Sequence, residues 1–219
     1  MKKLVCVAIA LLLIGSVALA EGVNPAPSIT MDDLMNQLTN THVFLENMPD
    51  GAPGFFLEVI NEYSPLFELP EYQHLLEINA AELSKLQSFE KAEDYFGGIR
   101  ISTGETLTLS ELFGDADPYI YEFYPIVAGG FHMEYGNVTA LMQFATPYAE
   151  GQQVLVMIGD IVDKEDENEI VWYGSLGTGV RHPEYNNEVF IEATFGPELM
   201  TVIQEEDTLI AIASEEVEF

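Results

Sequence analysis

The residues with the clearest chemical potential form an acidic stretch between two apolar runs. Carboxylates, which are oxygen ligands that suit calcium, stand at alternate positions in it: Asp163, Glu165, Glu167 and Glu169. The stretch lacks the glycine and the terminal bidentate glutamate of an EF-hand loop, and Lys164 would stand among the ligands. We therefore interpret residues 163–169 as the solvated tip of a β-hairpin, with calcium binding as the alternative.

The histidines are the next candidates for metal binding or acid–base chemistry. The chain has four, scattered and without HExxH spacing: His42, His74, His132 and His182. On a β-strand, residues two apart point to the same face, so His132 and Glu134 could together hold a metal or act as general acid and base. A hydrated sheet face shows the same alternation, and we favour that interpretation.

A glycine-rich segment at residues 174–179, GSLGTG, superficially resembles two catalytic loops. Ser175 lacks the G-x-S-x-G spacing of a nucleophile elbow, and no GK[ST] is present to form a phosphate loop. A bulge or a flexible strand exit explains the glycines. Arg181 and His182 follow directly and mark where an anionic group would bind if a pocket forms there. Pairing of Arg181 with a surface carboxylate is the favoured alternative.

Aromatic residues are frequent in the second half of the chain. Tyr119, Tyr121 and Phe123 have the spacing of one strand face, which could stack on sugar rings or on an apolar ligand. Core packing is the more common use of aromatic residues at this spacing, and the single tryptophan gives a carbohydrate platform little support.

From residue 99 onward the apolar pattern has a period of two and predicts a β-rich part, residues 99–219. Strands are expected at residues 99–102, 119–127, 131–135, 138–146, 153–162, 169–176, 188–195 and 208–213. Short turns such as Gly129-Gly130 and Gly136-Asn137 predict antiparallel neighbours in a meander. Residues 154–158 are apolar at every position, as expected for a central strand covered on both faces. Pro197 predicts a helix start before the last strand.

Residues 30–98 instead show mainly helical patterns. We expect helices beginning near Thr30, over residues 55–63, and from a capping box at Asn79 to a stop at Gly97. The predicted fold class is α+β, a single domain over residues 30–219 in which N-terminal amphipathic helices pack on a largely antiparallel, meander-type twisted sheet. A partly closed β-barrel is the alternative.

The N-terminus has the pattern of a cleaved secretory signal. Lys2 and Lys3 precede an apolar run that ends in the small residues of SVALA, so cleavage is expected after Ala20. The run is shorter than the roughly 20 residues that span a bilayer. Residues 21–29 form a short leader, and Cys6 would leave with the signal, so the exported chain has no disulfide. We expect a secreted or periplasmic bacterial protein without a membrane anchor after cleavage.

Charge is the strongest compositional signal. The whole chain has a formal charge of −30, and removal of residues 1–20 leaves five basic side chains against 37 carboxylates, or −32. Such a chain lacks the Lys/Arg cluster that binding to nucleic acid or anionic lipid requires. The charge is compatible with a cationic protein, a polyamine, a divalent cation, a basic polymer or another small ligand as partner, and solubility is the simplest reason for it. The hydrophobic fraction of 48% predicts a folded chain.

These patterns leave three hypotheses on function. The favoured one is an exported, strongly acidic, non-catalytic protein that binds a partner or small ligand through a sheet face or its loops. The alternatives are an extracytoplasmic hydrolase with a carboxylate/His site and a calcium-dependent structural protein. The sequence assigns no catalytic residue, no cofactor and no metal ligand, and it does not predict an oligomeric state.

Overall fold

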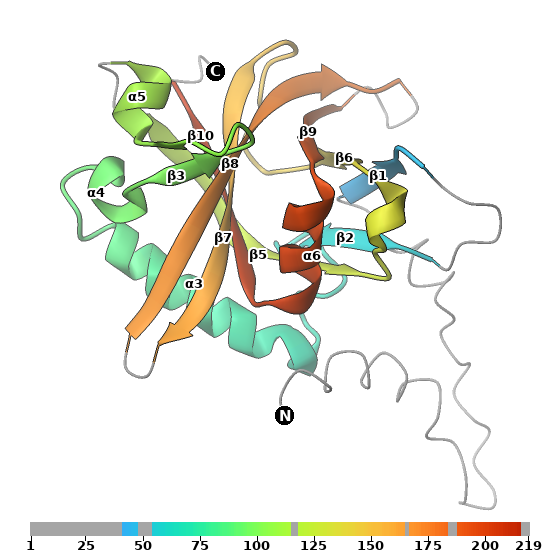
Figure 1. Cartoon of the computed structure of the whole chain (residues 1–219), viewed down its shortest axis with the longest axis horizontal. Coiled ribbons are helices and arrows are strands. Elements are labelled where there is room, and N and C mark those ends of the chain that lie inside the picture. The colour runs from blue at the N-terminus through green and yellow to red at the C-terminus, as the bar shows by residue number, and fades with distance from the viewer. Residues whose placement is uncertain (1–40, 48–53, 115–117, 165–166, 184–187, 216–219) are drawn as a thin grey trace, which may run out of the picture. The chain divides into compact units, whose positions relative to one another are not determined.

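The computed structural model describes residues 41–47, 54–114, 118–164, 167–183 and 188–215, which all belong to one compact unit (Figure 1). The predicted signal peptide at 1–20, the leader at 21–29 and the helix predicted from Thr30 lie outside the described residues.

In the described residues, ten strands form one sheet: β1 (Thr41–Leu45), β2 (Phe56–Val59), β3 (Ile99–Ile101), β4 (Thr106–Leu107), β5 (Tyr119–Gly129), β6 (Val138–Met142), β7 (Gln153–Lys164), β8 (Glu167–Arg181), β9 (Val189–Phe195) and β10 (Thr208–Ser214). The helices are shorter: η1 (Pro70–Tyr72), α3 (Gln73–Leu86), α4 (Ala92–Phe96), α5 (Leu109–Phe113), η2 (Met133–Tyr135) and α6 (Pro197–Glu205).

Eight of the strands follow the order β1-β6-β9-β8-β7-β10-β5-β2, and each neighbouring pair is antiparallel. The two end strands, β1 and β2, approach each other, and the Val59 N–H donates to Thr41 Oγ1 at 3.5 Å. The sheet is therefore a nearly closed barrel, and closure of this kind protects strand edges. The small β3–β4 hairpin lies off this path, where β3 pairs in parallel with Trp172–Gly174 of β8.

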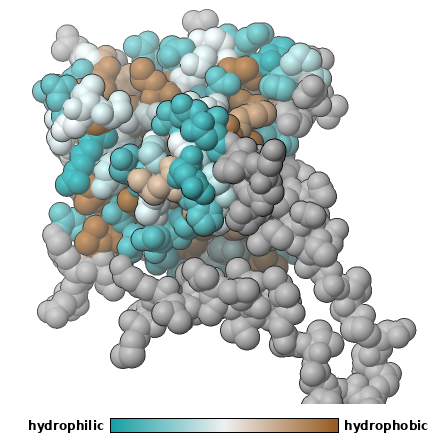
Figure 2. Space-filling view, turned by 45° about the vertical axis from the view of Figure 1, so that its right-hand side comes forward, coloured by the Kyte–Doolittle hydropathy of each residue, from teal (hydrophilic) through white to brown (hydrophobic). Residues whose placement is uncertain are grey.

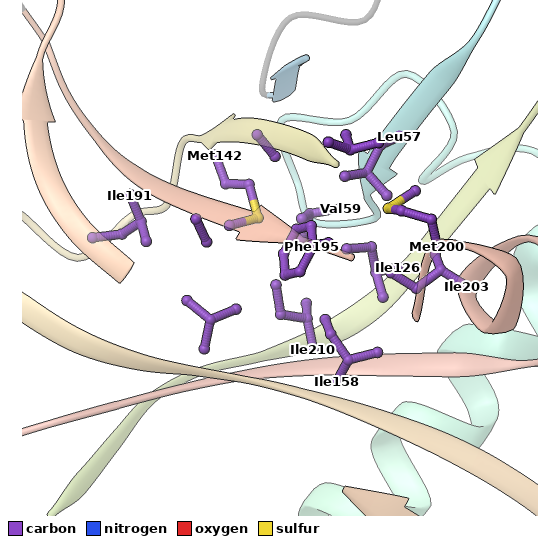
Figure 3. Packing of buried hydrophobic residues seen from close by; sticks show 14 of the residues in the cluster. Leu57, Val59, Ile126, Met142, Ile158, Ile191, Phe195, Met200, Ile203 and Ile210 are labelled. Carbon is purple, nitrogen blue, oxygen red and sulfur yellow. The ribbon is translucent and has the colours of Figure 1, made fainter. Parts of the chain in front are cut away.

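The barrel interior is the larger of two hydrophobic cores. Side chains from alternate positions of the strands converge there, as the labelled residues around Phe195 show (Figure 3). Helix α6 adds Met200 and Ile203 to this core, so its apolar face covers part of the interior. Pro197 lies in the first turn of α6, where backbone N–H groups have no acceptor within the helix, so the missing N–H of proline costs no hydrogen bond.

A second core lies on the outer face of the sheet. Leu155 and Met157 of β7 point outward, opposite in direction to Val154, Val156 and Ile158, and they pack with residues of α4 and α5. Strand β7 is therefore covered on both faces, as its apolar run predicts. Helix α5 begins with a capping box, in which the Thr108 and Glu111 side chains each accept from the other's backbone N–H.

The predicted strands and the C-terminal helix are largely confirmed, but the N-terminal helices are confirmed only in part. Residues 56–59, predicted as helix, form β2, and residues 41–45 form β1 within the part expected to be helical. Helix α3 begins at Gln73 after Pro70 has started η1, so the capping box predicted at Asn79 is wrong. The alternative, a partly closed barrel, describes the sheet better than an open sheet.

The predicted meander holds only for β7, β8 and β9. Strands β5 and β6 are consecutive but do not pair, because Gly130 and η2 carry the chain across to β9. Gly130 has a φ of 76°, and a Cβ there would lie 2.3 Å from the Gly54 carbonyl oxygen. This close backbone approach requires glycine. Residues 131–135, predicted as a strand, therefore form a crossing that contains a 3-10 turn.

The surface in Figure 2 intersperses hydrophilic residues with small hydrophobic patches. Exposed large apolar side chains are few among the described residues, and the most exposed is Leu176 on β8 at 74%. Scattered apolar residues are normal on a protein surface. Leu176 stands out because it also lines a groove, together with residues of α5, β7 and β10.

Candidate functional site

One end of the barrel interior holds a carboxylate among aromatic rings. Glu122 of β5 pairs with Ile212 of β10, whose side chain lies in the interior core, so Glu122 also points inward. Aromatic and acidic residues near it form what we call the tyrosine–glutamate cluster: Glu62, Tyr63, Tyr119, Tyr121, Glu122, Tyr124, Phe144 and Tyr148. Five of the chain's ten tyrosines are in this cluster.

Glu122 is almost completely buried, with 3% of its surface exposed. The Thr146 backbone N–H donates to Glu122 Oε1 at 3.1 Å. Burial raises the pKa of Glu122, and the charge of Glu62 adds to this shift, although hydrogen bonding with Thr146 and Tyr124 opposes it. The net direction shows that these hydrogen bonds do not fully replace the lost hydration of the carboxylate.

The aromatic rings form a continuous chain beside Glu122. Ring centroids are 6.0 Å apart for Tyr119–Tyr121, 6.3 Å for Tyr121–Tyr148 and 6.4 Å for Phe144–Tyr148. Tyr124 stacks on Phe144 at 6.4 Å with an interplanar angle of 17°. Tyr119 is 58% exposed, so the chain of rings leads from the buried carboxylate to the surface.

Tyr148 is the most deeply buried tyrosine of the cluster, at 5% exposure. Within the described part of the chain its hydroxyl has no partner at hydrogen-bond geometry, although Thr146 is near enough to influence it. Burial, followed by the charge of Glu122, raises the pKa of Tyr148, and the same two causes raise the pKa of Tyr124. Both phenols therefore stay protonated at neutral pH, and Tyr148 brings an unused donor close to the carboxylate.

The basic residues that follow residue 20 lie elsewhere in the fold. Lys85 binds Glu82, Arg181 binds Glu150, and the Arg100 guanidinium lies over the Tyr173 ring at 5.8 Å. Lys91 is the N-cap residue of α4, and Lys164 lies at the β7–β8 hairpin tip. In the described ranges, no ion pair joins a lysine or arginine to Glu122, and no basic charge contributes to its pKa shift. The cluster is thus acidic and aromatic.

A groove of about 570 Å³ lies beside the cluster, and we call it the α5 groove. Its lining is mostly apolar, with a few polar groups: Leu112, Phe113, Ala149, Gln152, Gln153, Val154, Leu155, Leu176, Ser214 and Glu215. Its volume falls within the range of small-molecule sites, and the groove is open to solvent along one side. Ser214 of the groove pairs with Tyr119 of the cluster on neighbouring strands, so the two sites adjoin.

A second buried carboxylate, Glu58, belongs to neither site. It lies on β2 with 0% exposure, and neither of its oxygens has a hydrogen-bond partner in the described residues. Burial raises the pKa of Glu58 to about 8, and the nearby Ser64 hydroxyl opposes this shift. Near neutral pH Glu58 is therefore largely a neutral carboxylic acid.

The acidic stretch at 163–169 lies at the end of the β7–β8 hairpin, as predicted. Strand pairing continues to the register pair Lys164 and Glu167, so only residues 165–166 separate the strands, and these two lie outside the described residues. The positions of the side chains of residues 163–168 are likewise not described. Calcium binding at this tip stays a prediction.

Both interpretations of His132 and Glu134, the functional pair and the favoured hydrated sheet face, assumed a strand that does not form, because residues 133–135 form the 3-10 turn η2. His132 precedes the 3-10 turn η2, in which residues three apart eclipse, and its ring packs on Tyr135 at 5.2 Å between centroids. His42 and His182, which no sequence spacing connects, instead come close enough for His182 to lower the pKa of His42, after burial as the main cause. His74 lies 3.5 Å from Asp207.

The glycine-rich segment is neither a bulge nor a strand exit, because β8 runs through it without interruption to Arg181. Its glycines allow neighbours to approach closely. A Cβ on Gly179 would lie 2.1 Å from the Ala149 carbonyl oxygen, where residues 149–152 pass over β8. Ser175 donates to the Thr194 carbonyl at 3.0 Å. Arg181 pairs with Glu150 at 3.3 Å, which confirms the favoured interpretation of this residue.

The predicted aromatic stripe on β5 is broken by a β-bulge. The register against β10 shifts so that Glu122 faces Ile212 and Ile120 faces Ala213. Tyr121 consequently packs with the interior core, whereas Phe123 belongs to the outer core. Tyr119 and Tyr121 remain in contact, but Phe123 does not share their face.

Two further findings concern metal binding and membrane crossing. Over the described ranges, no three side chains of His, Cys, Asp or Glu come together in a way that could hold a metal ion. In those same ranges, none of the helices is both long and apolar enough to cross a membrane.

Comparison with known proteins finds no matching family model, no matching curated protein and no matching solved structure.

Proposed function

We propose that this chain is an exported, non-catalytic protein that binds a small organic cation at the tyrosine–glutamate cluster. The observation that carries the proposal is Glu122, a buried carboxylate with a raised pKa that lies among tyrosine rings and has no basic partner in the described residues. Export rests on the sequence pattern at residues 1–20.

An organic cation complements every feature of the cluster. A positive charge near Glu122 would compensate the buried carboxylate, and tyrosine faces attract cations by about 0.5–2 kcal/mol per ring, more when water is excluded. The Tyr148 hydroxyl could act as a hydrogen-bond partner. The formal charge of −32 would raise the local concentration of any cation and repel anions.

The cluster does not have the composition of a hydrolase site. A carboxylate/His site needs a histidine, and the cluster contains carboxylates but no histidine; its phenols have pKa values raised further from neutrality, so they are poor proton donors and acceptors at pH 7. The hydrolase and the calcium-dependent structural protein remain alternatives from the sequence, but no specific observation favours either over cation binding.

The direct test is calorimetric titration of the purified protein with tetramethylammonium. We expect binding at about millimolar concentration, or −4 kcal/mol, from one carboxylate and several rings. Glu122→Gln should weaken it at least about tenfold. Glu192→Gln, at an exposed position of β9, removes the same charge and should leave binding unchanged. Equal losses in both variants would show non-specific attraction to an acidic surface and overturn the proposal.

A further inference from the structure

The α5 groove and the tyrosine–glutamate cluster adjoin at the end of β10. Ser214, which lines the groove, pairs with Tyr119, and its Oγ accepts from Gln152 Nε2 at 3.0 Å. The chain itself also joins the two, since Tyr148 of the cluster precedes Ala149 of the groove lining. A ligand that occupies one site therefore has the other within reach.

The groove and the cluster complement each other chemically. The groove is lined by the apolar side chains of Leu112, Phe113, Leu155 and Leu176, of which Leu176 is 74% exposed. Removal of this apolar surface from water by a ligand would be favourable. Its polar groups are amides, a hydroxyl and the Glu215 carboxylate, and none of them is basic. Tyr119 and Glu122 are three positions apart on β5, which is about 10 Å along an extended strand.

We propose that the ligand is a cationic amphiphile, a small molecule whose positive head lies at the tyrosine–glutamate cluster and whose apolar chain lies in the α5 groove. This inference rests on the proposed cation binding and adds the second half of the ligand. Charge complementarity selects the sign of the head group, because the cluster carries Glu62 and Glu122 and the groove carries Glu215. Anionic amphiphiles, including fatty acids, would bring like charges together.

The test compares alkyl chain lengths at a constant head group, below micelle-forming concentrations. Decyltrimethylammonium should bind at least about tenfold more tightly than tetramethylammonium, since tenfold corresponds to about 1.4 kcal/mol and fewer than two fully buried methylene groups supply it. Decyl sulfate, with the same chain and a negative head, should bind at least about tenfold more weakly than decyltrimethylammonium.

A groove variant separates the two halves of the ligand. Leu176→Gln changes an exposed side chain, so the fold should persist, and the gain from the decyl chain should shrink by about threefold or more while tetramethylammonium binding stays the same. Val162→Gln, on β7 and outside the groove lining, is the matched control and should change neither.

The outcomes distinguish this inference from the proposed function. Equal affinity for the decyl and methyl cations, or an unchanged chain-length gain in Leu176→Gln, would overturn the amphiphile and leave cation binding in place. Failure of both cations to bind would overturn both. Tight binding of decyl sulfate would show that the groove takes apolar chains irrespective of charge, which also contradicts the inference.

Discussion

Two regions of this protein combine a buried glutamate with aromatic rings, and they differ in how the carboxylate is satisfied. On the outer face, Glu82 is 2% exposed and accepts from Lys85 Nζ at 2.7 Å and from the Tyr95 hydroxyl at 3.1 Å. Tyr95 in turn contacts Phe96 and Trp172. In the interior, Glu122 has similar burial and more rings, but it accepts from the Thr146 backbone N–H and has no ammonium or guanidinium beside it in the described residues.

The two buried carboxylates differ in whether the chain itself supplies a positive charge partner. Glu82 has a charge partner and two charge-assisted hydrogen bonds, so its burial is compensated within the chain. Glu122 has a raised pKa and lies near the Tyr148 hydroxyl, which has no hydrogen-bond partner among the described residues. We interpret the outer region as structural and the interior region as a site that a cation completes.

The largest predicted effect concerns the third buried carboxylate, Glu58, which has neither an ion-pair partner nor a hydrogen-bond partner within the described ranges. Its pKa is about 8 in the folded protein against a usual value of 4.5, so the folded state holds the proton more tightly. Stability from this group is full below about pH 4.5 and is lost as pH rises through about 8, by up to about 5 kcal/mol.

Glu58→Gln should remove this pH dependence. Chemical denaturation at pH 5 and pH 9 measures it, and Glu192→Gln controls for the general repulsion among the many carboxylates. If the wild type and Glu58→Gln lose the same stability between the two pH values, Glu58 is not buried as a neutral acid.

The next prediction concerns the Lys85–Glu82 ion pair of the outer region. Lys85→Met should lower the free energy of unfolding by about 1–2 kcal/mol, because it leaves Glu82 buried beside only the Tyr95 hydroxyl. The value is modest because half of the Lys85 side chain is exposed to solvent. Adding Glu82→Gln to Lys85→Met should restore most of the loss in thermal unfolding, whereas purely additive effects would argue against the pair.

The two glutamates should respond to amide substitution with opposite signs. At pH 8, Glu122→Gln should raise stability by about 1 kcal/mol because it removes a poorly compensated charge, whereas Glu82→Gln should lower stability because it removes the partner of Lys85. Tetramethylammonium should raise the melting temperature of the wild type and raise that of Glu122→Gln much less. Destabilisation of both variants would place Glu122 among the structural carboxylates.

The smallest effect concerns the acidic hairpin tip. If it is only solvated, calcium chloride and sodium chloride at matched ionic strength should change thermal stability alike, within about 0.3 kcal/mol, because both act by screening. A calcium-specific rise at low millimolar concentration, reversed by chelator, would support the alternative of a calcium site there.

The strands were predictable because their apolar period and turn residues act locally. β7, apolar at every position from 154 to 158, is covered on both faces as expected. β2 was not predictable, because residues 55–60 form a short apolar run that fits either a helix or a strand until a partner such as β5 selects one. Barrel closure depends on β1 and β2 meeting, which no local pattern encodes.

The candidate site was harder to predict than the fold. Glu122 interrupts the aromatic strand YIYEFY, and this was the available signal, but the bulge beside it decides which side chains face inward. The contacts of Tyr148 with Tyr121 and Phe144 bring together segments that sequence spacing does not relate. Glu58 looks like an ordinary helical acid in the sequence, and its complete burial on β2 is a result of tertiary packing that no local pattern encodes.

Cation binding at the tyrosine–glutamate cluster depends on Glu122 being a buried carboxylate that lacks a positive partner. The most direct measurement is the pH titration of the Glu122 carboxyl carbon by NMR, assigned by its absence in Glu122→Gln, without and with tetramethylammonium. We predict a pKa above the usual glutamate value that falls when the cation binds, with affinity that rises with pH through that range. A normal pKa, or one that the cation does not change, would contradict this assignment.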